Sequence, residues 1–223
     1  EICACLVGSE MCIRDRDIRA SVPIIKQIIK AMHIPVLQVD GFEADDVIGT
    51  LATKAGKAGI TTYMLTPDKD YGQLVSDNVF MFRPRHGGGY ETMGPSEVCE
   101  KYDLSSTSQV IDLLALMGDS ADNFPGCPGV GPKTAAKLIA EFGSIDNMLA
   151  NSSKIKGKLR EKVESAVDDI RMSKFLATIR TDVPIDLNLD ELKVEEPDFT
   201  QLAEIFTELE FKSLLDKFIK KPQ

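Results

Sequence analysis

Residues 116–135 read Leu-Met-Gly-Asp-Ser-Ala-Asp-Asn-Phe-Pro-Gly-Cys-Pro-Gly-Val-Gly-Pro-Lys-Thr-Ala. Apolar residues at helical spacing lie on both sides of this stretch, so it joins two helices. Gly129 and Gly131 flank Val130, and Pro132 stands where the second helix begins, a position at which its missing N–H does no harm. A Gly-x-Gly turn that opens a helix exposes backbone N–H groups to an anion. The stretch therefore predicts a phosphate-binding turn, with a tightly packed helical corner as the alternative.

Two lysines extend this turn. Lys133 and Lys137 lie one helical turn apart and share a face. The spacing is not that of a nucleotide-binding P-loop, and a helix rather than a strand precedes it, which favours a grip on a phosphodiester backbone. Such contacts fix position and read no sequence. A run of basic residues at 154–162 is equally compatible with a solvated face.

The remainder of the C-terminal half is also helical. From about Ser105 the β signal fades, and short Gly, Pro or Ser turns separate the helical patterns. These patterns cover Val110–Met117, Lys133–Phe142, Ser144–Leu149, Lys158–Ile170 and Phe199–Leu209.

The N-terminal half alternates helices with strands, which predicts an α/β sheet with parallel members. A helical pattern runs from Ile18 to Met32, with Pro23 tolerable only in its early turns. Later segments predict a buried strand at 36–39, a helix at 43–57, a strand at 61–66 and a hairpin of strands 79–83 and 90–93.

Residues 5–16, Cys-Leu-Val-Gly-Ser-Glu-Met-Cys-Ile-Arg-Asp-Arg, differ from the rest of the chain. They resemble the in-frame translation of a transposase-type sequencing-library adaptor, and an unusual N-terminal strand is the alternative. We therefore expect residues 1–16 to be an artefact and native sequence to begin near Asp17. The predicted organisation is a partial α/β core over 17–105 and a helical module over 106–223.

Acidic residues gather in three places, each just after a predicted strand or helix. The clusters are Glu43, Asp45 and Asp46; Asp68 and Asp70; and Asp119 and Asp122. Ligands of open α/β sheets bind outside the carboxyl ends of the strands, so the clusters can converge. Converging carboxylates need cations, and oxygen ligands without His or Cys suit Mg²⁺ or Mn²⁺. Two such ions can clamp a phosphodiester. Each cluster alone is more typical of helix capping or of a turn, and only the three together favour a metal site.

Three stretches together resemble the flap endonuclease family of 5′ nucleases, which includes the 5′ nuclease domain of bacterial DNA polymerase I. They are Val-Asp-Gly-Phe-Glu-Ala-Asp-Asp-Val-Ile-Gly-Thr-Leu-Ala at 39–52, Thr-Pro-Asp-Lys-Asp-Tyr-Gly-Gln-Leu-Val at 66–75, and the stretch at 116–135. The resemblance implies a PIN-like α/β core with a mixed, largely parallel sheet, followed by a helix-three-turn-helix module.

The resemblance also implies functional residues. Glu43, Asp45 and Asp46 would serve one metal ion, while Asp68, Asp70, Asp119 and Asp122 would serve or bridge to a second. The helical hairpin at Gly126–Lys137 would hold duplex DNA, with a K⁺ ion on its backbone carbonyls. Its implied DNA-binding residues are Gly126, Gly129, Val130, Gly131, Lys133, Thr134 and Lys137.

The chain departs from the family pattern before Asp17. The family begins with strands that carry further metal-binding Asp residues, and with a basic and aromatic helical arch. Nothing before Asp17 matches these, so we expect weakened activity or none. The expected function is 5′→3′ exonuclease or flap endonuclease cleavage in primer removal and repair, beside downstream polymerase domains in the intact protein. The alternatives are a non-catalytic duplex-DNA-binding module and a PIN-type ribonuclease.

The formal net charge of -9 does not exclude a DNA partner, because the charge is uneven. Residues 40–122 carry 6 basic and 14 acidic side chains, whereas residues 126–162 carry 7 basic and 3 acidic ones. The sequence contains no run of about 18 apolar residues, so it predicts no membrane span. The 5 cysteines include no CxxC pair, which favours reduced thiols. We expect a monomer in the cytoplasm.

Overall fold

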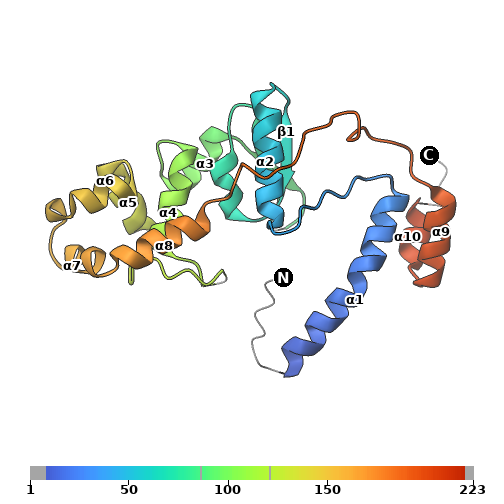
Figure 1. Ribbon diagram of the computed structural model, residues 1–223, viewed down its shortest axis with the longest axis horizontal. Coiled ribbons are helices and arrows are strands. Elements are labelled where there is room, and N and C mark those ends of the chain that lie inside the picture. Colours follow the sequence, from blue (N-terminus) through green and yellow to red (C-terminus); the bar gives the residue numbers. More distant parts are fainter. Residues whose placement is uncertain (1–8, 86, 121, 219–223) are drawn as a thin grey trace. The chain divides into compact units, whose positions relative to one another are not determined.

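The computed structural model describes residues 9–85, 87–120 and 122–218, and these form two compact units (Figure 1). The central unit comprises Phe42–Leu187. The terminal unit combines the chain up to Gly41 with the chain from Asn188 onward. All three predicted acidic clusters and the glycine turn belong to the central unit.

The sheet of the central unit contains β1 (Thr62–Leu65), β2 (Val79–Pro84) and β3 (Tyr90–Met93), in that order. β1 pairs with β2 in parallel, and β2 pairs with β3 antiparallel as a hairpin. α2 (Ala44–Lys57) precedes β1 in the chain, and α3 (Pro95–Tyr102) follows β3. The sheet is mixed, as predicted. Its described strands form one parallel and one antiparallel pair, so the expected parallel majority is not observed.

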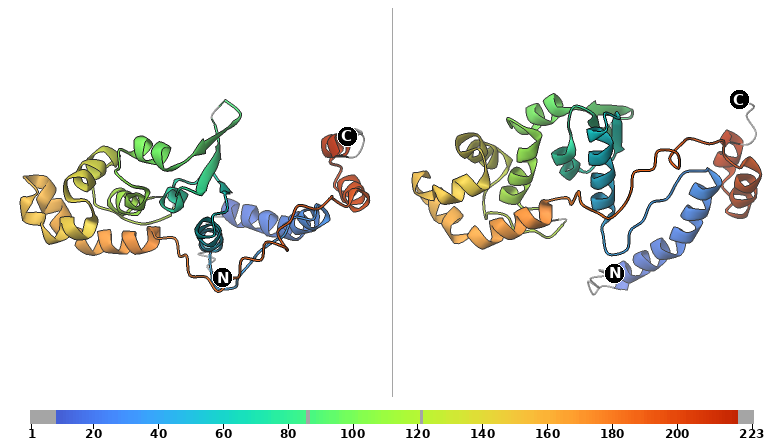
Figure 2. Two further views of the ribbon diagram at one scale, coloured as in Figure 1. Left: turned by 90° about the horizontal axis from the view of Figure 1, so that it is seen from above. Right: turned by 45° about the horizontal axis from the view of Figure 1, so that its top comes forward.

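The helical part of this unit contains α4 (Val110–Met117), α5 (Pro132–Phe142), α6 (Ile145–Ala150), α7 (Lys158–Ser165) and α8 (Val167–Ala177). Figures 1 and 2 show α5, α6 and α7 at the end of the unit away from the sheet. α4 joins the two parts: Leu113 and Leu116 are buried in the helical core, and Val110 and Leu114 in the core under the sheet. Short 3₁₀ turns occupy Lys69–Leu74 (η1), Thr107–Gln109 (η2) and Ser152–Lys154 (η3).

The terminal unit consists of α1 (Ser9–Ala31), α9 (Phe199–Glu208) and α10 (Lys212–Phe218). Ala31, Leu202 and Phe206 form its buried core. The Asp198 N–H donates to the Ala31 carbonyl at 2.8 Å, which ties the start of α9 to the end of α1. α1 begins at Ser9, so Pro23 lies in its interior rather than in the predicted early turns.

Most predicted elements are confirmed within a few residues, and two predicted elements are wrong. Residues 36–39 are extended but form no strand, because a strand needs a hydrogen-bonded neighbour and every described strand pairs within the sheet of the central unit. Val36 and Leu37 are exposed rather than buried. The predicted helix at 158–170 is broken at Ala166, where α7 ends and α8 begins. Residues 1–8 of the suspected artefact lie outside the described residues.

The loop after α4 is closed by two glycines in direct backbone contact. Gly118 and Gly126 have φ values of 69° and 61°. A Cβ on Gly126 would stand 2.3 Å from the Gly118 nitrogen, and one on Gly118 would stand 2.7 Å from the Pro125 carbonyl oxygen. The Cys127 N–H donates to the Leu116 carbonyl at 2.8 Å, and the Gly126 N–H donates to the buried Ser173 hydroxyl at 2.9 Å. This contact fixes where the loop that carries Asp119 and Asp122 leaves and rejoins the core.

Gly126→Ala is therefore expected to lower the free energy of unfolding by about 2–5 kcal/mol, the sum of a left-handed alanine and a backbone clash. Gly59→Ala is the matched control, because Gly59 has a φ of 76° but open space around its Cβ position. It should lose only about 1–2 kcal/mol. Urea denaturation followed by circular dichroism measures both values, and equal losses would contradict the contact.

Candidate functional site

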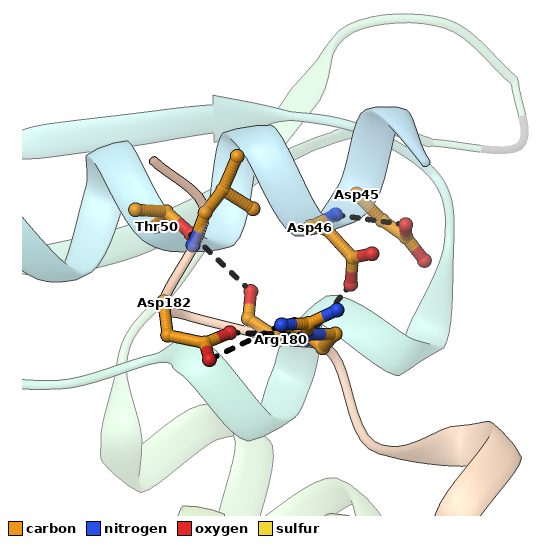
Figure 3. A network of polar contacts seen from close by, with 6 residues as sticks. Asp45, Asp46, Thr50, Arg180 and Asp182 are labelled. Atoms are coloured by element: carbon orange, nitrogen blue, oxygen red, sulfur yellow. Dashed lines mark hydrogen bonds and ion pairs between the residues drawn. The ribbon is translucent and has the colours of Figure 1, made fainter. Parts of the chain in front are cut away.

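The first acidic cluster opens α2. Glu43 is the N-cap residue and is exposed, while Asp45 and Asp46 lie half-buried in the first turn. The Asp45 Oδ1 accepts the Asp46 N–H at 2.8 Å, and the Asp46 Oδ1 accepts the N–H of Arg180 at 2.8 Å (Figure 3). Burial raises the pKa of the Asp45 carboxyl, and the charges of Asp46 and Asp68 raise it further against the backbone hydrogen bonds. The site thus disfavours a bare negative charge on Asp45.

The second cluster opens η1, directly after β1. The Asp68 side chain caps this turn by accepting the Asp70 N–H at 3.0 Å. Asp70 points inward: its Oδ1 is buried and has no hydrogen-bond partner among the described residues. Burial, followed by the charge of Asp68, raises the pKa of Asp70 to about 6, and Lys69 acts in the opposite direction. An unpartnered buried carboxylate oxygen keeps its full capacity to accept a hydrogen bond or to bind a cation.

The third cluster lies in the loop closed by Gly118 and Gly126. Asp119 is half-buried and forms an ion pair with Lys69, the residue between the two carboxylates of the second cluster. Burial lowers the pKa of Lys69, but the hydrogen bond and charge of Asp119 outweigh it, so the pKa is raised. Asp122 is exposed on the same loop. A hollow of about 500 Å³ lies beside it, lined by residues that include Asp119, Asn123 and Phe124.

The structure brings the three clusters within electrostatic range. Asp45 is affected by Asp68, and Asp70 by Asp119 and Asp122. Glu43 is not among the charges that act on Asp45 or Asp70. Tyr71 lies buried beneath the clusters. Its pKa is raised to about 12 by burial and by the charges of Asp45, Asp68 and Asp46.

The clusters do not close into one coordination sphere. Within the described residues, no three His, Cys, Asp or Glu side chains stand close enough together to hold a metal ion. Like charges repel at short range, and Lys69 and backbone N–H groups take up part of the carboxylate charge. The all-oxygen donor set and the unpartnered Asp70 Oδ1 nevertheless fit a hard divalent cation.

The predicted phosphate turn has two kinds of residue. Gly126 and Val130 are buried and serve packing. Thr134 is half-buried, whereas Gly129, Gly131, Lys133 and Lys137 are exposed, with Gly131 as the N-cap of α5. The Lys162 Nζ lies above this turn, 2.5 Å from where a Cβ of Gly129 would stand. A basic side chain from α7 therefore joins the lysine face of α5.

Sequence reasoning missed several residues that shape the site. For Lys69 the sequence does hold a signal, because a lysine between Asp68 and Asp70 is well placed to act as a counter-ion. Arg180 lies 134 residues from Asp46, and no pattern in the sequence connects the two. The same holds for Thr50, a wholly buried threonine on α2 that hydrogen-bonds to the segment around Arg180.

Two family models match the chain in order. The model described as "5'-3' exonuclease, N-terminal resolvase-like domain" matches residues 14–103, and "5'-3' exonuclease, C-terminal SAM fold" matches residues 105–200. A 5'-3' exonuclease of Aquifex aeolicus is 38% identical over 203 residues, which cover 91% of this chain and 68% of the relative. The chain therefore belongs to the 5'-3' exonuclease family, whose members are 5′ nucleases.

Two further comparisons agree. DNA polymerase I of Bacillus caldotenax is 40% identical over 87% of this chain, but the match covers only 22% of that protein. The chain thus corresponds to about a fifth of such a polymerase. The flap endonuclease of bacteriophage T5, solved in a complex with DNA and metal ions, shares the fold with a TM-score of 0.67 and 19% identity. That comparison covers 92% of this chain and 73% of the T5 chain.

Helices long and apolar enough to cross a membrane are not found in the part of the chain that the structure describes.

The raised pKa of Asp70 predicts how the stability of the protein changes with pH. Because its folded pKa of about 6 lies above the ordinary value of 3.8, its contribution to stability is full below about pH 4 and is lost as the pH rises through 6. As the pH rises from 4 to 7 in EDTA, the free energy of unfolding of the wild type should fall by about 1 kcal/mol more than that of Asp70→Asn. This figure is reduced because solvent reaches part of the Asp70 side chain.

Urea denaturation at both pH values measures this difference. Asp77→Asn, at an exposed carboxylate, is the control and should show no such change. A difference between wild type and Asp70→Asn that is the same at pH 4 and pH 7 would contradict the raised pKa.

Proposed function

We propose that the chain is the 5′ nuclease part of a DNA polymerase I-type protein. It would hydrolyse phosphodiester bonds at 5′ ends or flaps of duplex DNA, in primer removal and repair. The observation that carries the proposal is the electrostatic coupling of three acidic clusters, the second of which holds the unpartnered Asp70 Oδ1, in the same compact unit as a glycine turn flanked by lysines. The family membership and the T5 relative with DNA and metal ions support it.

In this proposal the carboxylates hold two divalent ions, Mg²⁺ or Mn²⁺. Glu43, Asp45 and Asp46 serve one ion, and Asp68, Asp70, Asp119 and Asp122 serve or bridge to the second. When bound, such ions supply an activated water and stabilise the leaving oxygen of a phosphodiester. Lys69 holds Asp119 by its ion pair, and burial leaves the Asp70 Oδ1 without a competing hydrogen-bond partner.

The glycine turn and its lysines position the duplex. The N–H groups at the start of α5 and the exposed Lys133 and Lys137 contact phosphates, and a K⁺ ion can bind carbonyls of the turn. These contacts read no sequence, as suits an enzyme that acts on any 5′ end. Val130 and Gly126 contribute by packing the turn rather than by touching DNA.

A second function, duplex binding without cleavage, is favoured by one observation. The described carboxylates are not gathered into a metal cluster, whereas the lysine face beside the turn is exposed. A PIN-type ribonuclease is disfavoured by the long glycine turn.

Cleavage of a 5′-flap duplex separates these functions. With 5 mM Mg²⁺ or Mn²⁺ we expect chelator-sensitive cuts, and Asp70→Asn should reduce the rate by at least about 100-fold, as expected when a ligand of a catalytic ion is removed. Asp77→Asn should cleave like the wild type. Tight flap binding by the wild type with no cleavage under any metal would instead establish the binding-only function.

Duplex binding tests the glycine turn. Lys133→Ala should weaken binding several-fold and reduce the slope of log K against log salt by about 1, because one phosphate contact is lost. Lys57→Ala, at the exposed end of α2, is the charge-matched control and should leave the slope unchanged. Fluorescence anisotropy at four salt concentrations measures both. Equal slopes for all three proteins would remove Lys133 from the interface.

A further inference from the structure

We call Ala177–Val183, the last residue of α8 and the segment after it, the strap; it contacts α2 and η1, the elements that carry two of the acidic clusters. Gln73 of η1 holds its first part with both ends of one side chain. The Gln73 Nε2 donates to the Ala177 carbonyl at 2.8 Å and to the Asp70 carbonyl at 3.0 Å, while its Oε1 accepts the Ile179 N–H at 3.0 Å. This amide thus connects the strap directly to the backbone of Asp70.

Thr50 of α2 holds the second part of the strap. Its hydroxyl accepts the Val183 N–H at 3.1 Å and faces the Arg180 carbonyl at 3.5 Å (Figure 3). Thr50 is 0% exposed, and Val183 and Ile179 are also buried, so water does not replace these contacts. Between the two anchors, the Arg180 N–H donates to the Asp46 Oδ1.

The exposed side of the strap is fixed as well. The Arg180 guanidinium stacks over the Phe42 ring at 4.8 Å and forms a two-point pair with Asp182, at 3.0 and 3.2 Å. These contacts orient the residue whose backbone N–H reaches Asp46. The strap is therefore held on three sides next to a carboxylate that it touches.

We propose that Thr50 and Gln73 are positioning residues for the metal site. Asp46 and Asp70 lie on different elements, and the negative charges around them favour separation. The strap joins the two elements by hydrogen bonds on both sides, so it sets the spacing of the two carboxylates. This inference rests on the proposed use of divalent ions by these carboxylates.

The test variants remove one anchor at a time. Thr50→Val is isosteric and removes the hydroxyl, and Thr50→Ser restores it. Thr53→Val makes the same change one turn along α2, at a half-buried position outside the strap contacts given above, and is the matched control. Gln73→Met removes the amide from the half-buried Gln73, which keeps the proposal testable if the wholly buried Thr50→Val variant fails to fold.

Two measurements on the whole chain test whether Thr50 and Gln73 position the carboxylates. In EDTA, hydrogen exchange of the Arg180 amide should be slow in the wild type, Thr50→Ser and Thr53→Val, and at least 10-fold faster in Thr50→Val and Gln73→Met. In calorimetric titration with Mn²⁺, the same two variants should bind about 10-fold more weakly, the usual effect of losing an outer-shell partner of a metal ligand.

The outcomes are distinguishable. Unchanged Arg180 exchange, or Mn²⁺ affinity equal to that of the wild type despite lower stability, would show that Thr50 and Gln73 serve the fold alone and overturn the inference. If the wild type binds no Mn²⁺, the proposed metal chemistry fails for this chain, and exchange of the Arg180 amide still decides whether the strap holds Asp46.

Discussion

Repulsion between carboxylates is the constraint on which the rest of the central unit depends. Three acidic segments from different parts of the chain lie within electrostatic range of one another, and one of them holds Asp70, whose carboxyl is half-buried with one oxygen unpartnered. The fold opposes this repulsion with a lysine paired to Asp119 and with N–H groups that point at carboxylates, and burial leaves Asp70 easily protonated. A strongly raised carboxyl pKa of this kind is typical of functional sites, although structural ion-pair networks also produce it.

Within the central unit, one helix, α4, connects the acidic clusters to the basic residues around the glycine turn. α4 contributes one face to the core under the sheet and another to the helical core. Its C-terminal end leads directly into the loop that carries Asp119, and the Gly118–Gly126 contact returns the chain to the glycine turn. The distance between the acidic and basic regions is therefore set by rigid packing.

Local patterns predicted much of this arrangement, and long-range contacts account for what was missed. The turn at Gly129–Gly131 and the carboxylates after β1 follow from sequence neighbours, because spacing alone places them at helix starts. The apolar run at 36–39 predicted a strand but carried no information about a partner strand. Thr50 looked like one more threonine on a helix, since its hydrogen-bond partners lie about 130 residues away.

The sheet has a further consequence at its outer side. β1 is the first strand in the order of the described sheet, and its only partner there is β2. Tyr63 and Leu65 on this strand are 58% and 68% exposed. Unpaired N–H and C=O groups next to exposed apolar side chains form a template for another strand. Two copies of the chain can therefore add to one another edge to edge, so association would increase with protein concentration even where the fold itself is stable.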